Sequence, residues 1–432
     1  MFFKTNFLIV IKCMVEMKRK HYLLFILLFP TVIFAQVIIK PIGCFAGTNG
    51  LHDNVLSHPE VGGVLLIEKW SEIEPSPGVY DFTNLNGKID SVRSSGLKYA
   101  LAISGGAFGS PEWLIDSLGA AYHSFQYQNQ NWKLPLWWDS IVNDKLTHLS
   151  HELGGEYASD TMLSHVYVTQ MSVNGIEGHL NGVDMAAFAV DGFTDQRWVE
   201  SAVYTSQLFA NSFPTKPIVF EVHEIGNDTI VPVAIISDLL NEPSLCERLG
   251  LGMWWISGKT SYQSNLIDFI SNFNGDKYAQ IIGRSDQLER FKDSLYSSVF
   301  TQAKELEIRY IEPWPYEFQH HTHDSLFHDF NLWASSNFTL SDTCISLNVS
   351  ELSSVAMEGI HIFPNPTQGN LNIKLSFPYQ KMEVHLANLN GEVLLKSKDQ
   401  FVLNLGQFPK GMYVLKFIID NNKVENKKII IQ

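Results

Sequence analysis

The stretch Glu68-Lys-Trp-Ser-Glu-Ile-Glu-Pro-Ser-Pro-Gly-Val-Tyr-Asp-Phe82 decides how this chain folds. It directly follows an apolar run at residues 63–67 that predicts a β-strand, and it leads into a helical stretch at residues 85–95. Glu-Pro and Pro-Gly pairs mark turns in any fold, so an ordinary turn is the simpler interpretation. A patterned stretch of fifteen residues makes that interpretation the weaker one and favours a βα unit with a long loop.

Such units recur along the chain. From Gln36 to about Phe338, short β-branched or apolar runs alternate with helical stretches, which is typical of a parallel sheet. Eight runs over about 300 residues match a (β/α)8 barrel. An open doubly wound sheet is the alternative, but no Gly-x-Gly-x-x-Gly follows the first run. The predicted strands are 37–43, 63–67, 98–104, 165–171, 217–222, 250–256, 278–282 and 307–311, and the predicted helices are 85–95, 140–153, 196–210, 231–240, 262–272 and 285–305.

Three loop motifs carry a resemblance to a known family. Trp70, Glu74-Pro and Gly78-Val-Tyr-Asp-Phe82 together resemble the end of the second barrel strand in clan A glycoside hydrolases, particularly the family 42 β-galactosidases. Ser104-Gly-Gly-Ala-Phe-Gly-Ser-Pro-Glu-Trp-Leu114 and Leu134-Pro-Leu-Trp-Trp-Asp139 are similar to passages of the same enzymes. The resemblance implies a (β/α)8 barrel that hydrolyses O-glycosidic bonds of an oligo- or polysaccharide without a cofactor. The loop residues expected to contact the carbohydrate are Trp70, Glu74, Trp113 and Trp138.

Barrel active sites form at the carboxyl ends of the strands, and glycoside cleavage usually needs two carboxyl groups. Thr169-Gln-Met-Ser-Val-Asn-Gly-Ile-Glu-Gly-His-Leu180, after the fourth predicted strand, places Glu177 where clan A enzymes keep their acid/base. In those enzymes Asn and Glu are adjacent, whereas here Asn174 and Glu177 are separated by two residues. We expect Glu177 to be the acid/base and Asn174 a substrate contact, and the alternative is a solvated loop glutamate.

The last predicted strand ends in Arg309-Tyr-Ile-Glu-Pro-Trp-Pro-Tyr316, with Glu312 at its tip. Neighbouring aromatic residues would stack on a sugar and raise the pKa of an acid beside them. The clan A nucleophile belongs on strand seven, where this chain offers Gln280. Either the strand count is off by one or that nucleophile is absent. We expect Glu312 to be the second carboxylate, with Gln280 and Trp314 as substrate contacts, and the alternative for Glu312 is a structural role.

Two further motifs have a simpler interpretation than catalysis. Phe220-Glu-Val-His-Glu224 ends the fifth predicted strand, where alternation puts Glu221 and His223 on one face. A Glu-His pair of this kind is more often a structural contact, so both are expected only as substrate contacts. Asn241-Glu-Pro243 reproduces the clan A acid/base triplet, but it follows a helix and precedes strand six, which is the wrong place. The histidines at 320–328 predict an exposed loop, and no metal site is expected.

The amino-terminal residues predict export. Met17-Lys-Arg-Lys-His-Tyr22 precedes an apolar run at 23–34, so residues 1–35 are predicted as a signal peptide, with Met17 as an alternative start. The run is shorter than the roughly 20 residues that span a bilayer, so the mature chain is expected to lack a transmembrane anchor. The remainder carries 26 basic and 44 acidic residues, which disfavours nucleic acid as a partner. Its three cysteines, Cys44, Cys246 and Cys344, allow one disulfide whose pairing the sequence leaves open.

The carboxyl-terminal part predicts a separate domain. Residues 339–358, rich in Ser and Thr, predict a linker, and short strands at 359–432 predict a small all-β immunoglobulin-like sandwich. Ile362-Phe-Pro-Asn-Pro-Thr-Gln-Gly369 and the closing Lys427-Lys-Ile-Ile-Ile-Gln432 resemble the type IX secretion C-terminal sorting domain. This resemblance implies handling by the type IX machinery of a Bacteroidota bacterium and a final place outside the cell or on its surface. The alternative is a sugar-binding accessory sandwich.

Residues 36–338 are therefore predicted to form a secreted glycoside hydrolase-like barrel that uses Glu177 and Glu312. A barrel that has lost catalysis and binds glycans at the cell surface is the alternative. A barrel hydrolase that acts on a non-sugar bond has no Gly-x-Ser-x-Gly or zinc motif to support it.

Overall fold

The computed structural model describes residues 33–347 and, beyond them, 360–363, 367, 369–375, 381–388, 393–398, 400–420 and 423–431. The chain divides into two compact units, one spanning Val32–Ser346 and one containing Leu347–Gln432. The predicted signal peptide lies almost entirely outside the described residues. It therefore stays a prediction, as do the domain boundaries at 338 and 358.

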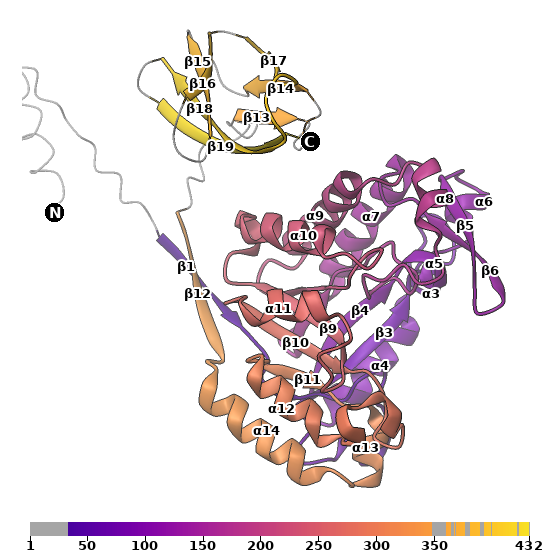
Figure 1. Ribbon diagram of the computed structural model, residues 1–432. Helices are drawn as coiled ribbons and strands as arrows, with labels where there is room; N and C mark the ends of the chain where they lie inside the picture. Colours follow the sequence, from indigo (N-terminus) through magenta and orange to yellow (C-terminus); the bar gives the residue numbers. More distant parts are fainter. Residues whose placement is uncertain are drawn as a thin grey trace, which may run out of the picture. The chain divides into compact units, whose positions relative to one another are not determined.

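The first unit is a (β/α)8 barrel, as predicted, and Figure 1 shows its helices on the outer side of the strands. The parallel sheet closes on itself because Ala46 forms a parallel bridge with Val64, and the Ala46 N–H donates to the Gly63 carbonyl at 2.9 Å. The strands follow one another around the barrel in the order β2 (Gly43–Cys44), β3 (Gly63–Lys69), β4 (Lys98–Ser104), β7 (Leu163–Tyr167), β8 (Ile218–Glu221), β9 (Leu249–Ile256), β10 (Asp276–Ile281) and β11 (Tyr310–Glu312).

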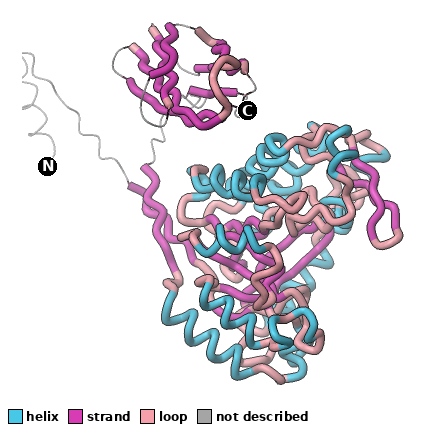
Figure 2. The backbone as a smooth tube through the Cα atoms, viewed as in Figure 1, coloured by secondary structure: helices cyan, strands magenta, loops and turns pink. Residues whose placement is uncertain are grey.

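Helices alternate with these strands along the chain, as Figure 2 shows. Side-chain caps fix several helix starts: Asp139 accepts hydrogen bonds from the Ile141 and Val142 N–H groups, and Thr194 accepts one from Arg197. The helices are α2 (Asp53–Leu56), α3 (Trp70–Ile73), α4 (Thr83–Ser94), α5 (Gly106–Gly109), α6 (Trp113–Asp116), α7 (Ser140–Tyr157), α8 (Met185–Val190), α9 (Asp195–Ser212), α10 (Ile230–Leu240), α11 (Ser264–Ser271), α12 (Ser297–Glu305), α13 (Pro315–His320) and α14 (Asp324–Asn337).

Three predicted elements differ from the structure. The first predicted strand, 37–43, is wrong because β1 (Ile33–Ile39) pairs with β12 (Ser341–Leu347) outside the barrel, and the barrel strand is the short β2. The predicted linker therefore starts with a strand, and its residues 348–358 lie outside the described part. Of the predicted helix 285–305 only α12 is α-helical, because two 3-10 helices, Leu288–Arg290 and Lys292–Ser294, interrupt the segment, and Asp293 has a φ of 52°.

Side chains fill the barrel interior in layers, as expected for a parallel barrel of this size. Across β10 and β11, Tyr278 is in register with Tyr310 and Gln280 with Glu312. Residues two apart on a strand share a face, so both pairs point into the interior. The ring of His165 lies 5.0 Å from the Tyr278 ring and 4.7 Å from the Tyr310 ring, centroid to centroid. The interior thus has an aromatic lower layer and a polar upper layer at the carboxyl ends of the strands.

The second unit is an antiparallel sandwich. Its sheets have the orders β13-β14-β17 and β16-β15-β18-β19. Met382, Val384 and Leu386 are buried while the residues between them are partly exposed, so one face of β15 packs into the core. The strands are β13 (Ile360–Phe363), β14 (Asn370–Leu375), β15 (Met382–Ala387), β16 (Val393–Lys398), β17 (Val402–Asn404), β18 (Gly411–Ile419) and β19 (Lys423–Ile431). This confirms the predicted all-β fold of the tail.

Candidate active site

The loop that follows β7, residues 170–178, folds tightly over the mouth of the barrel. Its Gly175 carbonyl accepts hydrogen bonds from the N–H groups of Gln170 at 2.9 Å and Gly105 at 3.3 Å. Gly175 has a φ of 81°, and a Cβ there would lie 2.2 Å from the Gly105 nitrogen, so only glycine fits. The loop is therefore held against the end of β4, and it presents Glu177 at the carboxyl ends of the strands.

The Glu177 carboxyl is oriented by Asn174. The Asn174 side-chain oxygen accepts the Glu177 N–H at 2.9 Å, and its Nδ2 donates to Glu177 Oε1 at 2.7 Å. This contact explains the two-residue separation of Asn174 and Glu177, because the turn brings their side chains together. Burial raises the pKa of Glu177 to about 7, although nearby His223 lowers it and Glu221 raises it further. Its side chain keeps 24% of its surface exposed.

His223 and Glu221 stand behind Glu177. His223 Nδ1 lies 3.0 Å from Glu221 Oε2, while His223 Nε2 lies 3.8 Å from Glu177 Oε2. Burial lowers the pKa of His223, but the surrounding carboxylates, Glu221 first, outweigh burial and raise it. An imidazolium at this position is a counter-charge that both carboxylates share. The predicted common face of Glu221 and His223 is confirmed, and the structure adds their link to Glu177.

Glu221 is a fixed carboxylate. It is almost fully buried, and its Oε2 and Oε1 accept the backbone N–H groups of Gly178 at 2.7 Å and Trp254 at 3.2 Å. Ligand atoms of Glu177, Glu221 and His223 lie within 4.8 Å of one another, a spacing that a metal ion could bridge. Glu221 already has backbone and imidazole partners, so hydrogen bonds satisfy it without a metal ion, and His223 reaches Glu177 only as an ion pair at 3.8 Å.

Glu312 lies in the polar upper layer inside the barrel. No part of it is exposed, and three side chains donate to its carboxyl: Tyr310 at 2.7 Å, Gln280 at 2.9 Å and Tyr167 at 3.1 Å. Burial raises its pKa to about 7, and the three donors limit that rise. In the hydrogen bonds of the described residues, Glu312 and Glu177 belong to separate networks. The strand count holds, so strand seven (β10) carries Gln280 at its end, and Glu312 is on strand eight.

The tryptophans predicted to contact a sugar differ in how exposed they are. Trp70 and Glu74 are fully buried, and the indole N–H donates to the Glu74 carboxylate at 2.7 Å, so neither side chain is exposed in this structure and their contact with a sugar stays a prediction. Trp113 is partly exposed and donates to the Glu74 carbonyl at 2.9 Å. Trp138 is partly exposed against Phe188, with ring centroids 5.5 Å apart.

Trp314 is also partly exposed, and its indole N–H donates to the Ile281 carbonyl at 2.8 Å. Trp314 and Tyr316, the aromatic residues expected beside Glu312, do not enclose its carboxyl. Tyr167 and Tyr310 contact the carboxyl instead, and Tyr316 packs under the Arg284 guanidinium at 4.8 Å. The Asn241-Glu-Pro243 triplet follows α10 and starts a 3-10 helix, so it lies away from the carboxyl ends of the strands, as predicted.

The histidine-rich segment packs onto the barrel in part. His58 Nε2 and His321 Nδ1 each lie 3.0 Å from the Asp324 carboxylate, and the two rings stack with centroids 4.8 Å apart. Three ligand atoms thus gather within metal-bridging distance. The Glu60 N–H donates to His58 Nδ1 at 3.2 Å, so neutral His58 carries its proton on Nε2 and donates it to Asp324. That tautomer suits a structural hydrogen bond better than metal ligation.

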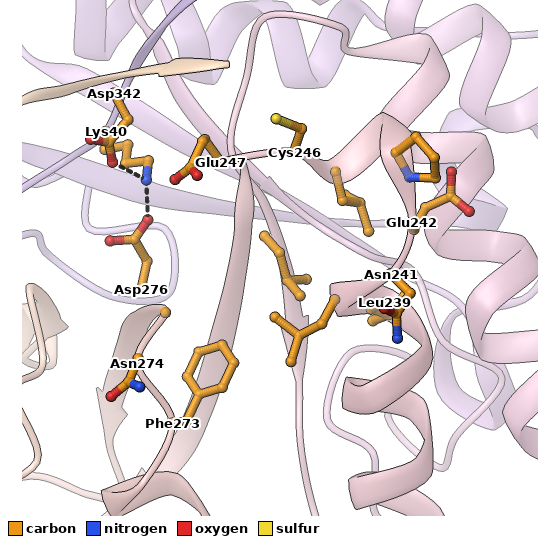
Figure 3. A pocket seen from close by; sticks show the side chains of 15 residues that line it. Lys40, Leu239, Asn241, Glu242, Cys246, Glu247, Phe273, Asn274, Asp276 and Asp342 are labelled. Carbon is orange, nitrogen blue, oxygen red and sulfur yellow. Dashed lines mark hydrogen bonds and ion pairs between the residues drawn. The ribbon is translucent and has the colours of Figure 1, made fainter. Parts of the chain in front are cut away.

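A cavity of about 450 Å³ lies at the opposite end of the barrel, where β9 and β10 begin. Figure 3 shows Lys40 at its edge, paired with Asp276 at 2.6 Å and with Asp342. Cys246 in its wall is disulfide-bonded, and Cys44 is a free, buried thiol. The cavity lies at the amino ends of the strands, whereas the active sites of barrel enzymes lie at the carboxyl ends, so we do not interpret it as an active site.

Three residues beside the site were not singled out from the sequence. Tyr167 supplies one of the donors to Glu312, and its position two residues after the inward-facing His165 could have indicated this. His179 stacks edge-on against His223 with ring centroids 5.6 Å apart, and burial lowers its pKa to about 3. Tyr262, 39% exposed, packs against Trp255 of β9, which in turn packs against His223 from the neighbouring strand end.

Comparisons with known proteins agree with the resemblances in both units. Residues 64–131 match the family model described as beta-galactosidase, and residues 361–432 match the secretion system C-terminal sorting domain. Ulvan lyase NLR42 from Nonlabens ulvanivorans is 27% identical over 116 residues, which is 26% of this chain and 21% of that protein. The chain therefore spans about a fifth of the length of this curated relative.

Solved structures with a similar backbone are distant in sequence. The catalytic domain of the Paenibacillus polymyxa beta-amylase is 11% identical, with a TM-score of 0.45 over 70% of this chain and 100% of that one. The cold-adapted beta-galactosidase from Rahnella sp. R3 is 10% identical, with a TM-score of 0.46 over 69% of this chain and 57% of that one. Endo-glycoceramidase II from Rhodococcus sp. is 12% identical, with a TM-score of 0.42 over 64% of this chain and 75% of that one.

The closed parallel sheet and the beta-galactosidase match over its second and third strands define a glycoside hydrolase-like (β/α)8 barrel protein. A secretion sorting domain follows the barrel in the chain and indicates secretion or attachment to the cell surface. Among the described residues, no helix is both long enough and apolar enough to cross a membrane.

Proposed function

We propose that this chain is a secreted glycoside hydrolase that cleaves O-glycosidic bonds of an oligo- or polysaccharide, with Glu177 as its acid/base. The observation that carries the proposal is the state of the Glu177 carboxyl. It is partly exposed at the carboxyl ends of the strands, and its pKa is about 7. A carboxyl that is protonated in a good fraction of molecules near neutral pH can protonate a glycosidic oxygen and then act as a base towards water.

The residues around Glu177 support this role. Asn174 holds one carboxyl oxygen, so the other, Oε2, faces His223 at 3.8 Å. His223, fixed by Glu221, supplies a positive charge that stabilises the carboxylate left after proton transfer. Glu221 and His223 are thus positioning residues in this proposal, and the carbohydrate would contact Glu177 itself.

Glu312 is the second carboxylate of the proposal. Hydroxyl and amide donors from Tyr167, Tyr310 and Gln280 stabilise an anion there, which a nucleophile or a general base requires. No part of the Glu312 side chain meets solvent, so its attack on a sugar requires the residues that cover it to move. A retaining mechanism would place the two carboxyls about 5 to 5.5 Å apart and an inverting one about 6.5 to 9.5 Å apart.

The enclosure of Glu312 also favours a second candidate, a barrel that binds glycans without cleaving them. In that case the sorting domain, which we propose is recognised by the type IX secretion machinery, would display a binding protein on the cell surface. The two candidates share the carbohydrate partner, and they differ in whether a bond is broken.

A hydrolysis screen with point variants decides between them. The full chain is tested on aryl glycosides and on soluble polysaccharides, and release of phenol or of reducing ends is measured. We expect Glu177→Gln and Glu312→Gln to lower kcat by about 10²- to 10⁴-fold, the usual contribution of acid/base catalysis. Glu289→Gln, on an exposed 3-10 helix, is the control and should be unchanged. Full activity in both catalytic variants would reject the assignment, and polysaccharide binding without hydrolysis would favour the binding protein.

A further inference from the structure

A second cavity, of about 510 Å³, lies beside the mouth of the barrel, between α5, α6 and the hairpin of β5 (Tyr122–Tyr127) and β6 (Gln130–Pro135). In Figure 1 this hairpin projects from the barrel near α5 and α6. Ser71, just after β3, and residues 106–108 and 110, just after β4, contribute to its wall. The cavity therefore opens on the same face of the barrel as Glu177, because both follow the carboxyl ends of parallel strands.

The aromatic residues Phe108 and Trp132 line this cavity, and Tyr127, which does not line it, packs against Phe108. The Phe108 ring lies 4.3 Å from the Trp132 ring and 6.2 Å from the Tyr127 ring, centroid to centroid. The Trp132 indole N–H donates to the Tyr127 carbonyl at 3.3 Å, which fixes the ring, and all three side chains are partly exposed. Flat aromatic surfaces that are held in place in this way suit the apolar face of a sugar ring.

The hairpin that carries Trp132 is a rigid support. Its strands pair from Tyr122 opposite Pro135 to Tyr127 opposite Gln130. The two turn residues, Gln128 and Asn129, have φ values of 52° and 61°, as a two-residue type I′ turn requires. The register is thereby fixed, so Trp132 is placed before any ligand arrives, which lowers the entropy cost of binding.

The polar lining of the cavity favours a neutral ligand. Asp116 and Lys133 form an exposed ion pair at 2.7 Å and cancel one another. Glu112 is exposed, and it has no ion-pair partner among the residues that the structure describes. Asn131 adds an exposed amide that can both donate and accept hydrogen bonds. The remaining acidic charge would repel sulfated or uronate sugars, while hydroxyl groups would find hydrogen-bond partners.

The wall of this cavity is hydrogen-bonded to the loop that presents Glu177. The Ala107 and Phe108 N–H groups donate to the carbonyls of Ser172 and Val173, in the loop that presents Glu177. On the far side of Glu177 the chain returns to the hairpin, where a Cβ on Gly182 would come within 2.8 Å of a Tyr127 ring carbon. Phe108 and Tyr127 are therefore anchored to the chain segments that precede and follow Glu177.

We propose that the cavity between α5, α6 and the β5–β6 hairpin is a carbohydrate-binding subsite that holds a neutral oligosaccharide segment by stacking on Trp132. The substrate is then a neutral polymer or long oligosaccharide that extends from Glu177 along this wall. The assignment to one substrate rests on the proposed function, whereas binding at the subsite is measurable without hydrolysis.

Affinity gel electrophoresis of the full chain tests the subsite. The background is Glu177→Gln, so that the gel polymer is not degraded. The probes are neutral galactan, mannan, xylan and hydroxyethylcellulose, with alginate and dextran sulfate as anionic polymers. We expect retardation by at least one neutral polymer, a loss of affinity of about tenfold in Trp132→Ala, and partial retention in Trp132→Phe, because a smaller ring still stacks. Trp333→Ala, on α14 and also partly exposed, is the matched control and should bind as the background does.

Several outcomes would overturn the subsite: equal retardation of Trp132→Ala and the background, retardation only by anionic polymers, or retardation by none of the panel. If Trp132→Ala does not fold, Asn131→Ala at the exposed rim replaces it and should also lower the affinity. Hydrolysis of aryl glycosides by the chain with native Glu177 and native Trp132 is measured alongside, and Trp333→Ala should leave it unchanged. Intact hydrolysis with unchanged binding would reject the subsite alone, whereas Trp132-dependent binding in a chain that hydrolyses nothing would reject the proposed hydrolysis alone.

Discussion

Glu312→Gln should make the barrel less sensitive to pH. The Glu312 carboxyl is fully buried, and its pKa is about 7 in the folded chain against 4.5 for an ordinary glutamate. Between those values the folded state binds a proton that the unfolded state has released, so the free energy of unfolding falls as the pH rises through this window. At about 1.4 kcal/mol for each pKa unit, the loss between pH 5 and pH 8 is about 2 to 3 kcal/mol.

Glutamine removes this loss because it stays neutral. Its carbonyl oxygen can still accept from the Tyr167 and Tyr310 hydroxyls, and its amide can face a turned Gln280 amide. We therefore compare the free energy of unfolding of Glu312→Gln with that of the native chain at both pH values. The difference should shift in favour of the variant by about 2 to 3 kcal/mol between pH 5 and pH 8.

The assay is urea unfolding followed by tryptophan fluorescence. All ten tryptophans precede residue 339, so the signal reports the barrel and not the tail. Glu305→Gln, exposed on α12, is the control and should show the same difference from the native chain at both pH values. A Glu312→Gln difference that is also the same at both pH values would refute the reasoning, because the carboxyl would then titrate alike in the folded and unfolded chains.

Two further predictions concern the mouth of the barrel. Activity should decline as the pH rises through about 7, because Glu177 loses the proton that it donates. His223→Gln should move this decline to higher pH, because it removes a charge that lowers the pKa of Glu177. A kcat/KM profile that declines at the same pH in the variant and the native chain would contradict the coupling. Gly175→Ala should lower the free energy of unfolding by about 1 to 3 kcal/mol and lower the Tm, because Gly175 has a φ of 81° and a Cβ there would meet Gly105. Gly155→Ala should raise the Tm slightly, because Gly155 lies on α7 with open space around it. Equal Tm shifts in the two variants would contradict this account.

The barrel could be predicted because its information is local. Each apolar run is long enough to mark a strand, and strand counting placed Gln280 and Glu312 on neighbouring strands, where the structure shows them in register. The first strand could not be found this way. β2 has only two residues, whereas the longer run before it pairs with β12, some 300 residues further along the chain.

The side-chain surroundings were less accessible. Trp70 and Glu74 looked like a substrate wall, yet their spacing of four residues fits a helical turn, in which their side chains meet and become buried. That signal was present in the sequence. By contrast, the enclosure of Glu312 depends on Tyr167 from the opposite part of the barrel, and the support of Glu177 depends on His223 from the next strand. Such contacts arise from closure of the barrel.

The most direct test of the central claim is the dependence of Glu177→Gln on the leaving group. The native chain and the variant are assayed on a dinitrophenyl glycoside, whose leaving group needs no proton, and on the matching alkyl glycoside, whose leaving group does. If Glu177 is the acid, kcat/KM of the variant should fall by about 10²- to 10⁴-fold on the alkyl glycoside and far less for the bond-breaking step of the dinitrophenyl glycoside. Equal losses on both substrates, or none on either, would contradict the assignment of Glu177 as the proton donor.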